Sequence, residues 1–143
     1  MSDDSRCAVG TSVAVPLLVA SHEAHQAVRL WAAERTLALS GHALAETYAV
    51  LTRFPGDARV RSSDAVMLID ENFPRNVSLL PDVASGTHHN LARLGISGGA
   101  TYDGLVALAA HQHDLVLATR DVRARPTYEA VGVRVEVIAD RPA

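Results

Sequence analysis

Short apolar runs of strand character alternate along this 143-residue chain with longer segments of helical periodicity. Parallel strands need crossover connections, which are usually helices, so this alternation predicts a parallel sheet covered by helices on both faces. The expected fold is a three-layer α/β/α domain with a central, mostly parallel sheet. The predicted strands are residues 7–9, 36–40, 77–80, 115–119 and 133–138.

Helical segments fill the intervals between these runs, and capping or breaking residues mark several of their ends. Thr11 and Ser12 can cap the first helix, in which Pro16 is tolerable only within the first turn. Pro74 and Gly95 follow the expected ends of two later helices. The predicted helices are residues 13–19, 21–35, 42–53, 62–73, 81–94 and 102–113, with a short helix between 120 and 130.

The composition is that of one folded domain, which we expect to span residues 1–143. Apolar residues make up 48% of the chain and charged residues 20%, which excludes a disordered tail. No apolar run approaches the ~20 residues of a membrane span, and the first residues lack the basic start of a signal peptide. The single cysteine, Cys7, has no disulfide partner, so we expect a cytoplasmic protein without a membrane partner. A net charge of −3 also argues against the overall basic surface of most nucleic-acid binders.

Three acidic residues stand out by their positions. Glu46 lies within an otherwise apolar helical segment, Asp103 begins the sixth predicted helix, and Asp121 closely follows a strand. Ligands of parallel α/β sheets bind at the carboxyl ends of strands and at the helix starts that follow them. Clustered carboxylates repel one another unless a cation neutralises them, and oxygen ligands favour Mg²⁺ or Mn²⁺ over zinc. The sequence therefore indicates a candidate site for one of these ions.

Each acid also has a purely structural interpretation. Asp103 could interact with a helix dipole, Asp121 could cap the next helix, and Glu46 could face solvent. The seven histidines show no zinc pattern, because no two of them are spaced i, i+4 beside an acid. Cys7 falls in a buried strand, where we expect it to be inert. The chain has neither a glycine-rich phosphate loop of the usual spacing nor a G-x-S-x-G nucleophile motif.

Four segments follow one another in an order and at a spacing that resemble the PIN-domain family. Among its members, the chain is most similar to the toxin ribonucleases of VapBC-type toxin–antitoxin modules. Each segment alone is a weak signal, whereas four in register extend over nearly the whole chain. The segments are VGTSVAVPLL at residues 9–18, ALAETYAVLTRFP at 43–55, GISGGATYD at 95–103 and LATRD at 117–121.

The resemblance implies a metal-dependent endoribonuclease that cleaves single-stranded RNA. Such proteins bind Mg²⁺ or Mn²⁺ through an acidic cluster at the carboxyl edge of a parallel sheet. The matching catalytic and metal-binding positions in this chain are Glu46, Asp103 and Asp121, with Thr11 or Ser12 in a supporting role. A metal held in this way can activate a water and stabilise the charge that develops on the phosphate.

The same resemblance implies two protein partners and an RNA substrate. We expect a cognate antitoxin to cover the acidic site with an arginine, and a second copy of the chain to form a homodimer. The helices of residues 42–53 and 62–73 are candidate dimer faces, although their apolar stripes are equally consistent with core packing. Arg53 and Arg120 are candidate RNA contacts.

One position departs from the family pattern. Where such proteins carry an aspartate directly after the first strand, this chain has Gly10, which offers no side-chain ligand. The expectation is therefore an impaired nuclease. Three alternatives stay open: a catalytically silent PIN-fold module that binds RNA or an antitoxin, an α/β domain unrelated to RNA, and a glycine required for a backbone with φ > 0.

Overall fold

The computed structural model of the chain describes residues 6–139. Within this range, four strands form one sheet, namely β1 (Arg6–Val9), β2 (Thr36–Leu39), β3 (Val116–Thr119) and β4 (Val135–Val137). Their order in the sheet is β2-β1-β3-β4, and each neighbouring pair is parallel. The expected α/β fold is therefore confirmed, with described strands that are all parallel.

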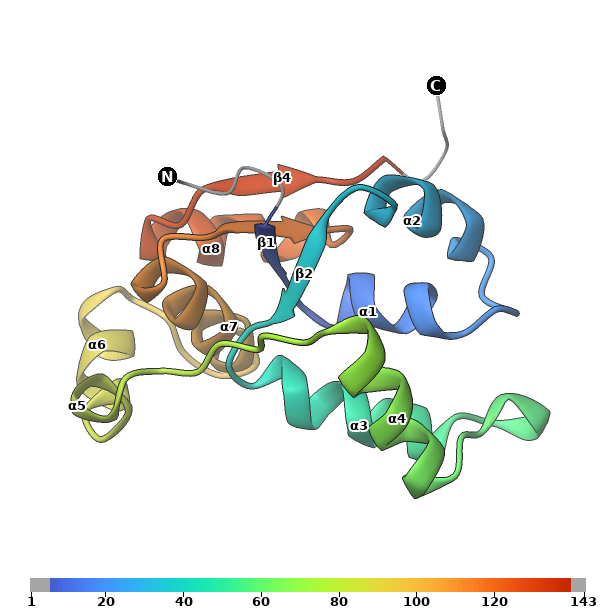
Figure 1. Ribbon diagram of the computed structural model, residues 1–143. Helices are drawn as coiled ribbons and strands as arrows, with labels where there is room; N and C mark the ends of the chain where they lie inside the picture. Colours follow the sequence, from blue (N-terminus) through green and yellow to red (C-terminus); the bar gives the residue numbers. More distant parts are fainter. Residues whose placement is uncertain (1–5, 140–143) are drawn as a thin grey trace.

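Helices cover both faces of the sheet (Figure 1). One layer contains α1 (Thr11–Leu18), α2 (His25–Ala32), α3 (Ala43–Arg53) and α4 (Ser62–Asn72), and the other contains α5 (Pro81–Ala84), α6 (Thr87–Arg93), α7 (Ala100–Gln112) and α8 (Arg125–Val131). The 3₁₀ turns η1 (Gly56–Ala58) and η2 (Val122–Ala124) follow α3 and β3. None of the helices in residues 6–139 is long and apolar enough to cross a membrane.

The two central strands, β1 and β3, form the middle of the core. Ala8, Val9, Leu117 and Ala118 are fully buried, because helices cover both faces of these strands. This burial explains why the two strands are continuous apolar runs in the sequence. Cys7 is buried beside them, and burial, followed by the nearby Glu136 carboxylate, raises the pKa of its thiol to about 11. The thiol is therefore a poor nucleophile at neutral pH.

The predicted strand at residues 77–80 is wrong. Only Val77 pairs, through a single parallel bridge to Ser40 at the end of β2. The side-chain oxygen of Asn76 accepts a hydrogen bond from the Leu39 N–H (2.9 Å), in the place that a backbone carbonyl of a fifth strand would take. After Val77, the Ser78 carbonyl contacts His113 Nε2 (2.9 Å) and the Leu80 N–H donates to Gln112 Oε1 (3.0 Å), so these backbone groups bond to side chains rather than to a strand.

Two predicted helices also have different limits. Residues 81–94 form α5 and α6 rather than one helix, since the chain turns at Gly86, a residue of low helix propensity. The helix expected from residue 21 begins at His25 instead. There the His22 Nδ1 accepts a hydrogen bond from the Ala24 N–H (3.0 Å), a local contact that competes with helix formation.

The start of α1 differs from expectation at two residues. Gly10 is the N-cap, while Thr11 and Ser12 are already helical, so neither of them caps the helix. Pro16 lies in the second turn rather than the first, and it has no N–H to offer the Ser12 carbonyl four residues earlier. Nη1 of Arg120 donates to that carbonyl instead (3.2 Å). The proline thus leaves an acceptor that ties α1 to the end of β3.

The chain after β2 approaches α7 closely at Gly41. This residue has φ +55°, and a Cβ on it would lie 2.9 Å from the Leu105 carbonyl oxygen. Gly56 has a similar φ of +70° but no atom within 4 Å of its Cβ position.

We expect Gly56→Ala to cost about 1–2 kcal/mol of unfolding free energy through backbone strain alone, and Gly41→Ala to cost more. Urea denaturation of both variants measures the difference, and equal losses would contradict a close approach at Gly41.

Candidate active site

The carboxyl edge of the sheet brings together two segments that are more than 100 residues apart. β1 and β3 are neighbours, with Val9 in register with Ala118. Because the strands are parallel, the residues that follow them emerge at the same edge, with Gly10 after β1 and Asp121 after β3.

Helix α7 is held against this edge from two sides. The hydroxyl of Ser40, fully buried at the end of β2, donates to the Val106 carbonyl (2.7 Å). On the opposite side, a Cβ on Gly104 would lie 2.8 Å from a methyl carbon of Leu91, so a glycine allows α6 to pack closely on α7. These contacts position the first turn of α7, which carries Asp103.

A pocket of about 330 Å³ lies where these elements meet. Glu46 from α3, Asp103 from α7 and Asp121 from the turn after β3 line it together, so the fold brings all three acids to one cavity. The other lining residues are Gly10, Thr11, Ser12, Val15, Val50, Val106 and Tyr128.

The charges in this pocket act on one another. Burial raises the pKa of Asp103, and the negative charges of Asp121 and Glu46 raise it further. The direction of the shift means that the ionised form of Asp103 is disfavoured in this environment. A bound cation would relieve the same repulsion.

Two of the acids also make local contacts. Oδ1 of Asp121 accepts a hydrogen bond from the Arg123 N–H (3.0 Å) and caps η2, so its structural interpretation holds alongside its place in the pocket. Oε2 of Glu46 lies 3.7 Å from Nε2 of His42. Among residues 6–139, no three His, Cys, Asp or Glu side chains stand close enough to hold one metal ion together. Gly10 adds no donor to the set.

The hydroxyl groups of Ser12 and Thr11 in the pocket differ in their hydrogen bonding. Ser12 Oγ lies 3.4 Å from Thr119 Oγ1 and accepts a hydrogen bond from the Arg120 N–H (3.2 Å), so it fixes the turn after β3. Thr11 Oγ1 is buried in the pocket wall with no hydrogen-bond partner in the structure. A buried hydroxyl without a partner is a feature that a bound ligand or water would satisfy.

The donors fit a hard divalent cation with an open coordination sphere. The side-chain donors that line the pocket are all oxygens, which suits Mg²⁺ or Mn²⁺. Mg²⁺ usually keeps several waters and takes only one or two carboxylates in addition to substrate phosphates. The pocket fits this pattern of partial coordination better than an all-protein cage.

Tyr128 was not among the residues that the sequence singled out. Helix α8 places it in the pocket wall, where it is buried. Burial, followed by the charge of Asp103, raises the pKa of its phenol, while a side-chain hydrogen bond with Thr119 opposes this shift. A lone tyrosine in a short helix belongs to no motif, so only the three-dimensional arrangement reveals it.

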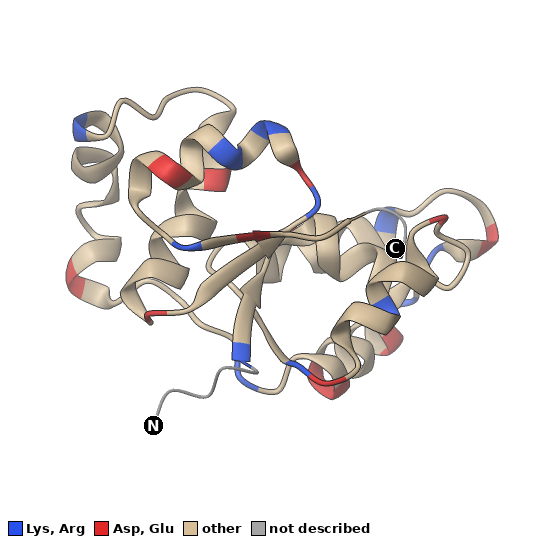
Figure 2. Ribbon diagram, turned by 90° about the horizontal axis from the view of Figure 1, so that it is seen from above, with Lys and Arg blue, Asp and Glu red and all other residues tan. Residues whose placement is uncertain are grey.

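The two arginines expected to contact RNA lie in different settings. Arg53 is exposed at the end of α3, and its spacing from Glu46 and Val50 places it on the same helical face as these pocket residues. Arg120 lies next to the pocket and donates to the Ser12 carbonyl. Figure 2 shows basic and acidic residues dispersed over the described elements rather than gathered into one basic face.

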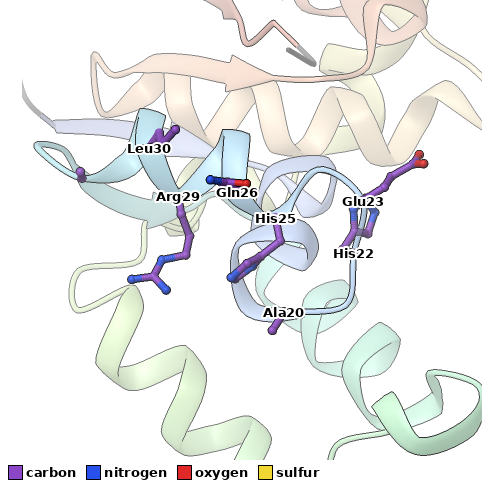
Figure 3. A pocket seen from close by; sticks show the side chains of 8 residues that line it. Ala20, His22, Glu23, His25, Gln26, Arg29 and Leu30 are labelled. Carbon is purple, nitrogen blue, oxygen red and sulfur yellow. The ribbon is translucent and has the colours of Figure 1, made fainter. Parts of the chain in front are cut away.

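A larger pocket, of about 650 Å³, lies away from the acids, beside α2 (Figure 3). His25 and Arg29 point to the same side of α2 there, and Glu23, its single acid, points away from them. His25 Nδ1 lies 2.7 Å from the Pro16 carbonyl, while burial and the charge of Arg120 lower the pKa of His22. This pocket does not offer the carboxylate set that the first one has.

The fold and the acidic pocket define a parallel α/β domain with a carboxylate-lined site at the carboxyl edge of its sheet. The family model described as the PIN domain matches residues 8–129, and the chain belongs to the PIN-domain family. Ribonuclease VapC27 of Mycobacterium tuberculosis is 54% identical over 132 residues, which cover 92% of this chain and 96% of that protein. Ribonuclease VapC40 of the same species is 39% identical over 130 residues, or 90% and 96% of the two chains. The resemblance inferred from the sequence is confirmed.

Two solved structures share the fold at low sequence identity. FitAcB from Neisseria gonorrhoeae superposes with a TM-score of 0.63 at 21% identity, covering 90% of this chain and 95% of that one. VapBC2 from Rickettsia felis, bound to a DNA fragment from its promoter, gives the same TM-score at 15% identity, covering 92% and 98%. Both comparisons support the three-layer arrangement.

Removal of the Asp103 charge tests the electrostatic description of the pocket. An acid whose pKa is raised by folding destabilises the folded state once the pH exceeds its ordinary pKa of about 3.9. We therefore expect Asp103→Asn to raise the melting temperature in EDTA at pH 7.5, by an amount that shrinks towards pH 4.5. Asp64→Asn is the control, because Asp64 lies in the first turn of α4 outside the pocket and should lose a little stability through the helix dipole. A lower melting temperature for Asp103→Asn at both pH values would contradict repulsion among the acids.

Proposed function

We propose that this chain is a divalent-metal-dependent endoribonuclease, the toxin of a type II toxin–antitoxin module, which cleaves single-stranded regions of RNA. The observation that carries the proposal is the convergence of Glu46, Asp103 and Asp121 in one pocket at the carboxyl edge of the sheet. Membership of the PIN-domain family and the ribonuclease names of two relatives support the class of reaction.

The residues of the pocket suit this reaction in distinct ways. One or two of the carboxylates of Glu46, Asp103 and Asp121 would bind Mg²⁺ or Mn²⁺ directly, and the ion would supply an activated water and stabilise charge on the phosphate. The unpartnered hydroxyl of Thr11 is available to a water or a phosphate oxygen in the same pocket. The phenol of Tyr128, which also lines the pocket, can donate a hydrogen bond to an oxygen of the substrate.

Gly10 weakens the site in this proposal because it lacks a ligand, and not because the backbone needs a glycine. Its φ of −103° and ψ of −170° are extended values that any residue adopts, so the alternative of a φ > 0 turn is wrong. A Cβ on Gly10 would lie 3.7 Å from Val106 Cγ1, an ordinary van der Waals distance. An aspartate is also a better N-cap for α1 than glycine is.

The proposed module adds two protein partners in the cytoplasm. An antitoxin would neutralise the pocket with an arginine that pairs with one of its three acids. A second copy of the chain would pack on the face that α3 and α4 share, where a groove of about 410 Å³ has a mostly apolar lining. Arg53 and Arg120 would contact RNA beside the pocket. The exposed apolar residues that line this groove are Leu44, Tyr48 and Val66.

Restoring a carboxylate at position 10 tests the function. We expect Gly10→Asp to bind Mn²⁺ more tightly by calorimetry, since affinity rises with ligand charge. Cleavage of a single-stranded RNA panel should rise by about 10²–10³-fold, the usual effect of one transition-state contact of ~3–4 kcal/mol. Gly10→Asn is the matched control, because it has the same size and N-cap capacity without the charge, and it should gain little.

The alternatives predict different results for these variants. A silent binding module would hold RNA or an antitoxin without cleavage in either form. An α/β domain unrelated to RNA would bind neither Mn²⁺ nor RNA. A folded Gly10→Asp protein that cleaves no better than the Gly10 chain would refute the impaired-nuclease proposal.

A further inference from the structure

Two aromatic rings from different helical elements contact each other beside the acidic pocket. Tyr102 lies in the first turn of α7, directly before Asp103, and His42 is the N-cap residue of α3, one turn before Glu46. The centroids of the Tyr102 and His42 rings are 4.8 Å apart, with 31° between their planes. His42 Nε2 also lies 3.7 Å from Oε2 of Glu46, so the ring pair lies beside one carboxylate of the pocket.

The Tyr102 ring contributes little to the core, because 55% of the residue is exposed. The His42 ring lies against it and restricts its orientation, so that much of the aromatic surface faces solvent in a defined position. Aromatic side chains that are fixed and exposed in this way are what single-stranded RNA-binding proteins use to stack unpaired bases.

The negative charge of the pocket favours a way of binding RNA that does not depend on its phosphates. Three carboxylates line the pocket, and the whole chain carries a net charge of −3, so RNA phosphates gain little general attraction there. An aromatic ring stacks on the flat face of a base. This contact does not depend on the charge of the RNA phosphates, and it occurs with every base. A ring beside the pocket can therefore bind the substrate at a place where the carboxylates repel its phosphate backbone.

We propose that Tyr102, supported by His42, stacks an unpaired base of the RNA substrate beside the acidic pocket. The stacked base would place the neighbouring phosphodiester next to Asp103. The proposal therefore requires that at least one base at the cleavage site is unpaired and free to stack on the tyrosine ring. This inference rests on the proposed ribonuclease function, but it concerns binding and is testable without cleavage.

Fluorescence of 2-aminopurine tests the proposal with the full chain in EDTA, where metal-dependent cleavage does not occur. Short single-stranded RNAs carry the probe at each position in turn, and the position with the strongest quenching is then made abasic. We expect Tyr102→Ala to weaken binding about tenfold and to remove the quenching, while Tyr102→Phe preserves both. The dependence of affinity on salt should stay unchanged, since no phosphate contact is lost.

The abasic RNA separates stacking from a structural role. We expect it to bind the unmodified chain about tenfold more weakly, and Tyr102→Ala to cause no further loss with this RNA. Equal losses on both RNAs would show that Tyr102 only links α3 to α7, and equal losses for the Phe and Ala variants would assign the effect to the hydroxyl. Either result, or unchanged affinity in Tyr102→Ala, would overturn the stacking proposal.

The failure of stacking and the failure of the ribonuclease function are distinguishable. If Gly10→Asp cleaves RNA while Tyr102→Ala binds it normally, only the stacking proposal is overturned. If the folded Gly10 chain binds none of the RNAs at low salt and Gly10→Asp does not cleave them, both proposals are overturned. Thermal melts of each variant confirm that it is folded.

Discussion

The parallel pairing of β1 with β3 is the constraint on which the site depends. It places the turns after residues 9 and 119 side by side, so that α1 and η2 start at one edge of the sheet. Polar contacts then fix the two turns to each other, since Ser12 Oγ meets both Thr119 Oγ1 and the Arg120 N–H. The missing N–H of Pro16 adds a third link, because it leaves the Ser12 carbonyl open to the Arg120 side chain. A helix irregularity thus helps to join the two halves of the pocket.

The extent to which the sequence predicts this fold follows from how each element is buried. The central strands are covered on both faces, so their apolar runs identify them directly. The same signal fails at residues 77–80, where a short apolar stretch packs on the sheet edge and pairs through a single bridge. The backbone of Ser78 and Leu80 bonds instead to the side chains of His113 and Gln112, which are long-range contacts that no local pattern contains.

The residues of the candidate site also differ in whether the sequence predicts them. The positions of Glu46, Asp103 and Asp121 follow from the family resemblance together with the rule that parallel strands end at one edge. Tyr128 and the contact between His42 and Tyr102 depend on how α8 and α3 pack around that edge, and neither has a spacing signature. The extended backbone of Gly10 is likewise a property of the turn in three dimensions, because glycine adopts extended and left-handed conformations with similar ease.

The glycine also changes the balance between stability and function in this pocket. Asp103 already has a raised pKa because of burial and its two acidic neighbours, so each further negative charge at the edge costs folding free energy in the absence of metal. A carboxylate in place of Gly10 would add to that repulsion, yet it would also strengthen the binding of a cation that stabilises only the folded state. Under the proposed function, the chain with Gly10 would have a lower metal affinity and a metal-free fold with less internal repulsion, as functional sites commonly oppose stability. The concentration of divalent cation would therefore decide whether a carboxylate at position 10 raises or lowers the free energy of unfolding. Only a bound cation converts clustered carboxylates from a destabilising group into a stabilising one.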